Sequence, residues 1–234
     1  MAASFRFKKF EVSHSRSALK VGTDAIVLGA SMTLKSSDRR LLDIGTGCGV
    51  IALMVAQRLG HLACAISGID IDGPSIEEAA QNFAASPWAE NLEAVCVPLK
   101  EYTPSAPFDV IFSNPPFFEN SLKNPDPRET AARHTDSLSY RDICAFVTQN
   151  LSADGRLSLI LPFEAYCALV RTAASFGLHP FRMLSVRTTP RKDPKRLMAE
   201  FSRTRGPVME ESLILQDGPG RSAQYAALTK DFYL

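Results

Sequence analysis

Short apolar runs alternate with stretches of helical periodicity over most of the chain. Five of the runs are typical of buried strands, because they are short and mostly apolar. They are residues 40–44, 66–72, 92–97, 108–113 and 155–161. Most segments between them repeat apolar residues every three or four positions, as in a helix packed on a sheet. This alternation predicts an α/β fold with a doubly wound, Rossmann-like, mostly parallel sheet.

The last part of the chain is expected to close this sheet. Residues 183–188 and 197–202 suit a closing antiparallel pair, which brings the predicted sheet to seven strands. Residues 213–215 are a candidate for one more strand, and the aromatic tail at 228–234 is expected to pack down. No stretch has the composition of a domain linker, so we predict a single domain over residues 1–234.

The first 38 residues are predicted to form an extension that packs on the domain. Residues 5–12 alternate apolar and polar positions with a phase slip at Lys8 and Lys9, which predicts an edge strand with a bulge. Apolar residues then form a helical stripe within residues 25–34, and Thr23 is the predicted N-cap. The extension is therefore expected to consist of one strand and one helix.

The composition leaves room for one hydrophobic core. The 234 residues are 45% apolar with a net charge of +1, so any surface for nucleic acid must be local. The five cysteines contain no CxxC pair and are predicted to be reduced core thiols. No residues have metal-ligand spacing, and we find neither an apolar leader nor a membrane span. We therefore expect a monomeric cytoplasmic protein without a metal or membrane contact.

A glycine-rich turn follows the first predicted strand of the parallel sheet. Gly45, Gly47 and Gly49 have GxGxG spacing, whereas dinucleotide-binding loops have GxGxxG. Asp43 precedes them, where its carboxylate would repel a pyrophosphate, and Asp70 lies at the end of the next strand, where an acid accepts both ribose hydroxyls. The arrangement resembles the motif of S-adenosylmethionine-dependent methyltransferases, in which the first acid interacts with the amino group of the methionine part.

A second informative stretch, Asn114-Pro115-Pro116-Phe117, follows the run at 108–113. Two prolines cannot continue a strand ladder, so the chain leaves the sheet there and the proline after Asn114 holds that residue extended. The Asn114 amide oxygen and the Pro115 carbonyl suit the two N–H bonds of an exocyclic NH2 group, on whose ring an aromatic face stacks. The alternative is a strand end followed by a proline turn and two core phenylalanines.

These motifs are expected to meet at one place. Gly45, Asp70 and Asn114 all follow the carboxyl ends of predicted strands, which is where ligands bind in doubly wound sheets. The polar stretch at 119–135 follows directly and has no periodicity. A stretch of this length suits a substrate lid, and a surface loop is the alternative.

Basic residues gather in two places despite the balanced overall charge. One is the N-terminal strand, and the other is the predicted hairpin at 187–196, which has five positive charges against one acid. Ordinary solvated surface and contact with RNA phosphates are both open for each place. The candidate RNA contacts are Arg6, Lys8, Arg133, Arg191, Lys192, Lys195 and Arg196.

The chain resembles the bacterial tRNA1(Val) (adenine(37)-N6)-methyltransferase family over nearly its whole length. The matching stretches are Lys20-Val21-Gly22-Thr23-Asp24, Asp43 to Gly49, Asn114 to Phe117, Ala132-Arg133-His134 and Leu228 to Leu234. The resemblance implies a class I methyltransferase fold, S-adenosylmethionine as donor and N6 of an adenine in the tRNA anticodon loop, adenine 37, as acceptor. Phe117 departs from the tyrosine that is frequent in the family. Pro98-Leu99-Lys100 stand where an acid or amide often holds the cofactor adenine.

The resemblance also implies roles for the candidate residues. The amine site would be formed by Asn114, Pro115, Pro116 and Phe117. The donor would be held by Asp43, Gly45, Gly47, Gly49, Asp70 and Asn114, together with Lys20 and Thr23. Thr23 lies at a predicted helix start, where free N–H groups suit an anion such as a carboxylate.

Three alternative functions are open. A motif of the same kind as Asn114 to Phe117 serves enzymes that methylate release-factor glutamine N5 or ribosomal RNA guanine N2, although these usually have an additional substrate domain. A nicotinamide oxidoreductase can use a similar first strand and loop, but the GxGxG spacing argues against it. A donor-binding RNA chaperone without activity is the third, and the intact Asn-Pro-Pro-Phe sequence argues against it.

Overall fold

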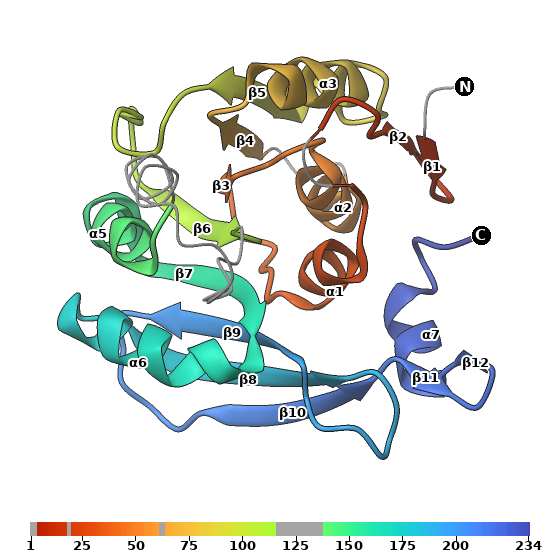
Figure 1. Ribbon diagram of the computed structural model, residues 1–234. Helices are drawn as coiled ribbons and strands as arrows, with labels where there is room; N and C mark the ends of the chain where they lie inside the picture. Colours follow the sequence, from red (N-terminus) through yellow and green to blue (C-terminus); the bar gives the residue numbers. More distant parts are fainter. Residues whose placement is uncertain (1–3, 18–19, 61–63, 116–137) are drawn as a thin grey trace, which may run out of the picture.

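The computed structural model describes residues 4–17, 20–60, 64–115 and 138–234 of the chain. The strands of the central sheet are β3 (Arg40–Ile44), β4 (Ala65–Asp70), β5 (Leu92–Cys96), β6 (Phe108–Ser113), β7 (Leu151–Pro162), β8 (His179–Arg187), β9 (Arg196–Ser202) and β10 (Met209–Ile214). Their order in the sheet is β10-β8-β9-β7-β6-β3-β4-β5 (Figure 1). β9 is antiparallel to both β7 and β8, and the other neighbours run parallel. The predicted doubly wound, mostly parallel architecture is confirmed.

The central sheet of the described residues has eight strands rather than the predicted seven. β10 pairs in parallel with β8 along its whole length, from Met209 opposite Arg182 to Ile214 opposite Arg187. The strand lies at the edge of the sheet, so its first four residues are exposed and only Leu213 is buried. An edge strand with this much polar surface has no continuous apolar run, which is why only its last residues were visible as a candidate.

Helices cover both faces of the sheet (Figure 1), and the buried apolar residues form two clusters. One cluster includes residues of α1 (Thr23–Ser31), α2 (Val50–Leu59), α3 (Gly73–Ala84) and α7 (Ala223–Thr229). The other includes residues of α5 (Tyr140–Asn150) and α6 (Tyr166–Ser175). Ser139 and Asp142 form a capping box at the start of α5. Short 3-10 turns, η1 (Ala89–Asn91) and η2 (Phe163–Ala165), precede β5 and α6.

The N-terminal strand prediction is wrong in its form. β1 (Ser4–Arg6) and β2 (Glu11–Ser13) make a separate antiparallel hairpin instead of one bulged edge strand. The phase slip at Lys8 and Lys9 marks the turn, where the Phe7 N–H donates to the Phe10 carbonyl at 2.9 Å. A second small hairpin, β11 (Gln216–Asp217) with β12 (Gly220–Arg221), precedes α7.

The predicted limits of the first helix are also corrected. Gly22 is the N-cap of α1 and Thr23 is its first helical residue, so the predicted cap is displaced by one position. The helix ends at Ser31 because the residues that would form its next turn bind a distant strand instead. The Thr33 N–H and hydroxyl both donate, at 2.8 Å, to the buried carboxylate of Glu200 on β9.

The C-terminal tail packs down, as predicted, and its partner is the N-terminal hairpin. The Lys8 N–H donates to the Phe232 carbonyl at 2.8 Å. The Lys8 ammonium donates to the Lys230 carbonyl at 2.5 Å, and Gln57 Nε2 donates to the Asp231 carbonyl at 2.7 Å. Lys8, predicted as an RNA contact, therefore holds two segments of the protein together.

All five cysteines are free thiols. Cys48 and Cys144 are buried and Cys64 is half-buried, but Cys96 and Cys167 are exposed, so the prediction of core thiols is wrong for those two. No helix in the described ranges is long and apolar enough to cross a membrane.

Candidate functional site

The glycine-rich turn joins β3 to α2 and lies against the end of β4. The N–H groups of Gly45 and Thr46 both donate to the Ile69 carbonyl, at 2.8 and 3.0 Å. Gly45, Gly47 and Gly49 all have positive φ, at 72°, 55° and 80°. A Cβ on Gly49 would lie 2.4 Å from the Phe83 ring, so this position admits no side chain, whereas a Cβ on Gly45 or Gly47 would meet nothing within 4 Å. The loop thus keeps its backbone open on one side.

Asp43 is fully buried at the end of β3. One carboxylate oxygen, Oδ2, accepts a hydrogen bond from Thr46 Oγ1 at 2.8 Å. The other, Oδ1, is buried and has no hydrogen-bond partner among the described residues. Burial raises the pKa of Asp43 to about 7, and the nearby charge of Asp70 acts in the same direction, whereas the Thr46 hydrogen bond and the backbone N–H of Ala52 oppose them. A buried carboxylate with an unused acceptor suits a cationic ligand group.

Asp70 lies at the end of β4, where its two oxygens are fixed by different backbone groups. Oδ2 accepts from the Gly47 N–H at 2.9 Å, and Oδ1 accepts from the Asp72 N–H at 3.0 Å. Each oxygen keeps a second lone-pair direction, so the carboxylate can still accept two hydroxyl groups. Asp72 is the N-cap of α3 and accepts from the Ser75 N–H at 3.0 Å.

Asn114 follows β6 directly. Ser113 Oγ donates to the Ile44 carbonyl at 2.6 Å and ties this strand end to β3. The Asn114 Oδ1 atom is buried and has no hydrogen-bond partner among the described residues. Pro115 is buried. Pro116, Phe117, Arg133 and the predicted lid at 119–135 lie outside the described residues.

The sheet register brings these groups together. Ile44 on β3 pairs with Ile69 on β4 and with Ser113 on β6. Gly45, Asp70 and Asn114 are the next residues along the chain, so they lie side by side at the carboxyl-terminal edge of the sheet, where its parallel strands end. The predicted convergence of the three motifs is confirmed.

Two residues beside the loop were missed in the sequence. Thr46 fixes Asp43, as described above, and its Oγ1 is also packed so closely on Gly68 that a Cβ there would lie 2.7 Å away. Ile71 follows Asp70 and is 59% exposed, so it presents an apolar side chain to solvent next to this carboxylate. The signal for Ile71 was the sequence Ile69-Asp70-Ile71-Asp72, whose alternation continues past the end of the strand.

The segment after β5 is a tight turn. The Pro98 carbonyl accepts from the N–H groups of Glu101 and Tyr102, at 2.9 and 3.1 Å. Leu99 is buried in the core cluster that contains residues of α5. Lys100 is on the surface and forms an ion pair with Asp142 at 3.2 Å.

The start of α1 lies near the same edge of the sheet. Lys20 and Thr23 are exposed, and the Gly22 carbonyl accepts from the Ile26 N–H at 3.2 Å. Asp24 Oδ2 accepts from Arg196 Nε on β9 at 2.8 Å. Arg196, predicted as an RNA contact, is therefore engaged with α1 within the protein.

The basic hairpin between β8 and β9 also projects from this edge, because β8 runs parallel to β7, β6 and β3. Arg191, Lys192 and Lys195 are exposed. The Lys195 N–H donates to the Val186 carbonyl at 3.0 Å, and Arg187 Nη1 donates to the Lys192 carbonyl at 3.2 Å. Arg6 is exposed on β1.

Comparisons with known proteins agree on one family. The family model "Methyltransferase small domain" matches residues 5–135. A tRNA1(Val) (adenine(37)-N6)-methyltransferase of Bacteroides fragilis is 41% identical over 98% of this chain and 97% of the relative. A relative of the same name from Photobacterium profundum is 36% identical over 100% of this chain and 99% of the relative.

Solved structures support the fold alone. A "predicted O-methyltransferase" from Agrobacterium tumefaciens has a TM-score of 0.68 and 17% identity, covering 89% of this chain and 96% of that chain. A methyltransferase from Pyrococcus furiosus has a TM-score of 0.61 and 17% identity, covering 84% of this chain and 90% of that chain.

Proposed function

Because this chain belongs to the tRNA1(Val) (adenine(37)-N6)-methyltransferase family, we propose that it methylates N6 of an adenine in the tRNA anticodon loop, with S-adenosylmethionine as donor. One observation carries the proposal. Two buried acceptor atoms without partners among the described residues, Asp43 Oδ1 and Asn114 Oδ1, lie at the carboxyl ends of the neighbouring strands β3 and β6. Such atoms are costly in a folded protein unless a ligand supplies donors.

The residues around the glycine loop fit the donor. Asp43 offers its unused oxygen to the ammonium of the methionine part, and Asp70 offers two acceptor directions to the ribose hydroxyls. The open side of the loop at Gly45 and Gly47 leaves room for close approach. Ile71 offers an exposed apolar face beside Asp70 for the adenine. Lys20 and the exposed start of α1 at Thr23 suit the carboxylate.

Asn114 and Pro115 are proposed to hold the acceptor amine. The N6 of adenine is a poor nucleophile, because its lone pair is delocalised into the ring. Asn114 Oδ1 and the Pro115 carbonyl would accept its two N–H bonds, which favours a pyramidal nitrogen with a localised lone pair. Phe117, which follows in the sequence, would stack on the base and contribute roughly 1–3 kcal/mol.

The bound donor supplies a methyl group on a sulfonium sulfur, which is electrophilic and leaves as a neutral thioether. The chain contributes alignment, since one sheet edge holds both the donor residues and the amine acceptors. A strong general base is not required, because the alkylated N6 is acidic and loses its proton to water.

The exposed cations of the basic hairpin are proposed to contact tRNA phosphates. We expect Lys192→Glu to raise the KM for tRNA several-fold and to reduce the slope of log affinity against log salt by about 1. Lys35→Glu is the matched control, since Lys35 is exposed on the loop before β3, at the opposite edge of the sheet. Steady-state kinetics at two or more salt concentrations measure the KM for tRNA and its salt dependence for each variant. Equal effects from the two variants would contradict a specific role for the hairpin.

Incubation with tritiated S-adenosylmethionine and tRNA that lacks N6-methyladenosine, followed by nucleoside analysis, tests the whole proposal. Label in N6-methyladenosine is the expected result. Donor binding without any labelled nucleoside would contradict tRNA as substrate and favour ribosomal RNA or release-factor glutamine. No donor binding would contradict the roles given to Asp43, the glycine loop and Asp70.

A further inference from the structure

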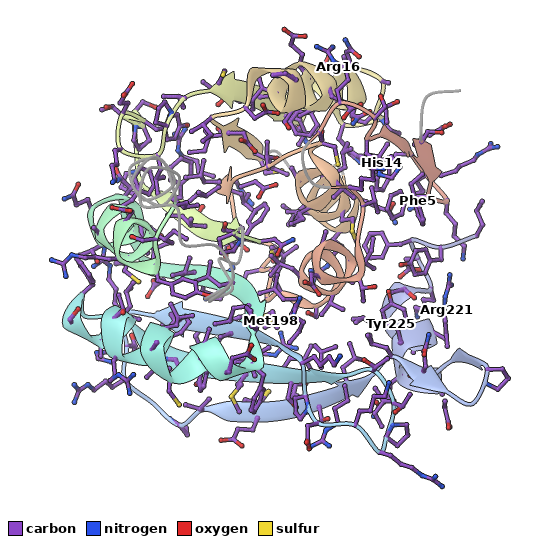
Figure 2. The ribbon with its side chains drawn as sticks, viewed as in Figure 1. Phe5, His14, Arg16, Met198, Arg221 and Tyr225 are labelled. Carbon is purple, nitrogen blue, oxygen red and sulfur yellow. The ribbon has the colours of Figure 1, made fainter. Side chains whose placement is uncertain are left out.

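A segment of the N-terminal extension is held against α3 and the glycine loop. We name residues 13–17 the strap; it begins at Ser13, the last residue of β2, and His14 and Arg16 lie on it (Figure 2). Its first residue, Ser13, exchanges two hydrogen bonds with the Asn82 amide: the Ser13 N–H donates to Oδ1 at 2.9 Å, and Nδ2 donates to the Ser13 carbonyl at 2.8 Å. His14 Nδ1 accepts from the Val21 N–H at 3.0 Å and ties the strap to the chain that leads into α1.

The centre of the strap is bound to one carboxylate. Glu78 on α3 is only 2% exposed. Its Oε1 accepts from the Ser15 N–H at 2.8 Å, the Ser15 hydroxyl at 3.1 Å and the Arg16 N–H at 3.2 Å. Its Oε2 accepts from the Ser17 N–H at 2.9 Å and the Ser17 hydroxyl at 2.6 Å. Burial acts to raise the pKa of Glu78, but these hydrogen bonds outweigh it and lower the pKa, so Glu78 is ionised at neutral pH.

These contacts connect the strap to the candidate donor site. Asn82 Nδ2 also donates to the Cys48 carbonyl in the glycine-rich loop at 2.9 Å. Glu78 and Asn82 are four residues apart and share one face of α3. That helix starts just after Asp70, and the strap leads on towards Lys20 and the start of α1. One helix face therefore holds the loop and the strap in a fixed relation.

We propose that Glu78 is a positioning residue for donor binding, which acts by holding the strap, and with it Lys20 and the start of α1, against the glycine loop. The inference rests on the proposed use of S-adenosylmethionine. The three successive N–H groups of residues 15–17 point at one carboxylate, so removing that carboxylate leaves them without this anchor. The strap would then lose its fixed position against α3. Donor binding would have to restore that position, which lowers the apparent affinity for the donor.

Calorimetry with S-adenosylhomocysteine and steady-state kinetics test the role. Glu78→Ala is expected to raise the Kd for S-adenosylhomocysteine and the KM for the donor by about 10- to 100-fold, with kcat at saturating donor changed little. Glu78→Gln keeps an acceptor oxygen and should recover part of the loss. Ser17→Ala removes only one hydroxyl contact and should give a smaller effect, and it serves if Glu78→Ala does not fold.

Glu77→Ala is the matched control. Glu77 is the neighbouring residue, is exposed, and pairs with the Arg16 side chain at the surface. It should leave the donor Kd within about twofold of wild type. Amide exchange at residues 15–17 should accelerate in Glu78→Ala and not in Glu77→Ala.

The outcomes separate this role from the proposed function. Folded Glu78→Ala and Ser17→Ala proteins that bind S-adenosylhomocysteine as tightly as wild type would overturn the positioning role, even if their melting temperatures fall. A kcat loss at saturating donor with unchanged Kd would overturn it as well. A wild-type protein that does not bind S-adenosylhomocysteine would instead contradict the proposed function.

Discussion

The Asn114→Ala variant is expected to transfer methyl groups about 10²- to 10³-fold more slowly than wild type, while its donor affinity changes little. The Asn114 Oδ1 atom is buried and without a partner among the described residues, so its removal takes away an acceptor that the proposed reaction uses. Donor affinity is expected to depend mainly on Asp43 and Asp70, which lie at the ends of β3 and β4. Single-turnover rates at saturating donor measure the first effect, and calorimetry with S-adenosylhomocysteine measures the second.

Asn150→Ala is the matched control for this prediction. Asn150 lies at the end of α5, just before β7 begins, which places it at the opposite edge of the sheet. Its amide donates to the Phe146 carbonyl at 3.0 Å, so the substitution removes one local contact. The control should react at the wild-type rate. Near-normal turnover by Asn114→Ala would show that N6 is held by other groups.

The Asp43→Asn variant is expected to lose donor binding by about 100-fold, since the proposed carboxylate–ammonium contact becomes a contact with a neutral amide. In wild type, the pKa of Asp43 is raised to about 7, chiefly by burial. Donor affinity should therefore increase as pH rises through 7 and fall by up to tenfold for each unit below it. Calorimetric titrations between pH 6 and 8, compared for the two proteins, test this dependence. A flat profile for wild type would contradict the Asp43 contact.

The same substitution should affect stability in the opposite sense. Because the folded protein holds the Asp43 proton up to about pH 7 and an unfolded chain releases it near the ordinary value of 3.8, wild-type stability contains a contribution that declines as pH rises between these values. Asp43→Asn removes this decline, so the unliganded variant should be the more stable protein at pH 8. Urea denaturation at pH 5.5 and 8 measures it. Asp154→Asn, at an exposed site on β7, is the control and should change neither property.

The sequence by itself determined the parts of this protein whose signals are local. The GxGxG turn requires positive φ, which glycine alone adopts without strain, and the three glycines do have it. Asp72 and Ser139 cap the helices that they precede. The position of Gly45, Asp70 and Asn114 at one edge also followed from the sequence, because parallel strands joined by crossover helices must place their carboxyl ends together.

Only the tertiary structure decided which polar side chains bind partners within the protein itself. Lys8 and Arg196 were candidate RNA contacts because they are basic. In the structure, the Lys8 ammonium donates to the Lys230 carbonyl and the Arg196 guanidinium binds the Asp24 carboxylate. Glu78 is a charged residue of α3 that the sequence did not single out, yet it is buried under the strap, and β10 joins the sheet although most of it is exposed. Each of these outcomes depends on a partner far away in the chain. Hydrophobic periodicity reports which face of an element is buried, but it carries no information on which distant backbone or charged group will meet a polar side chain there.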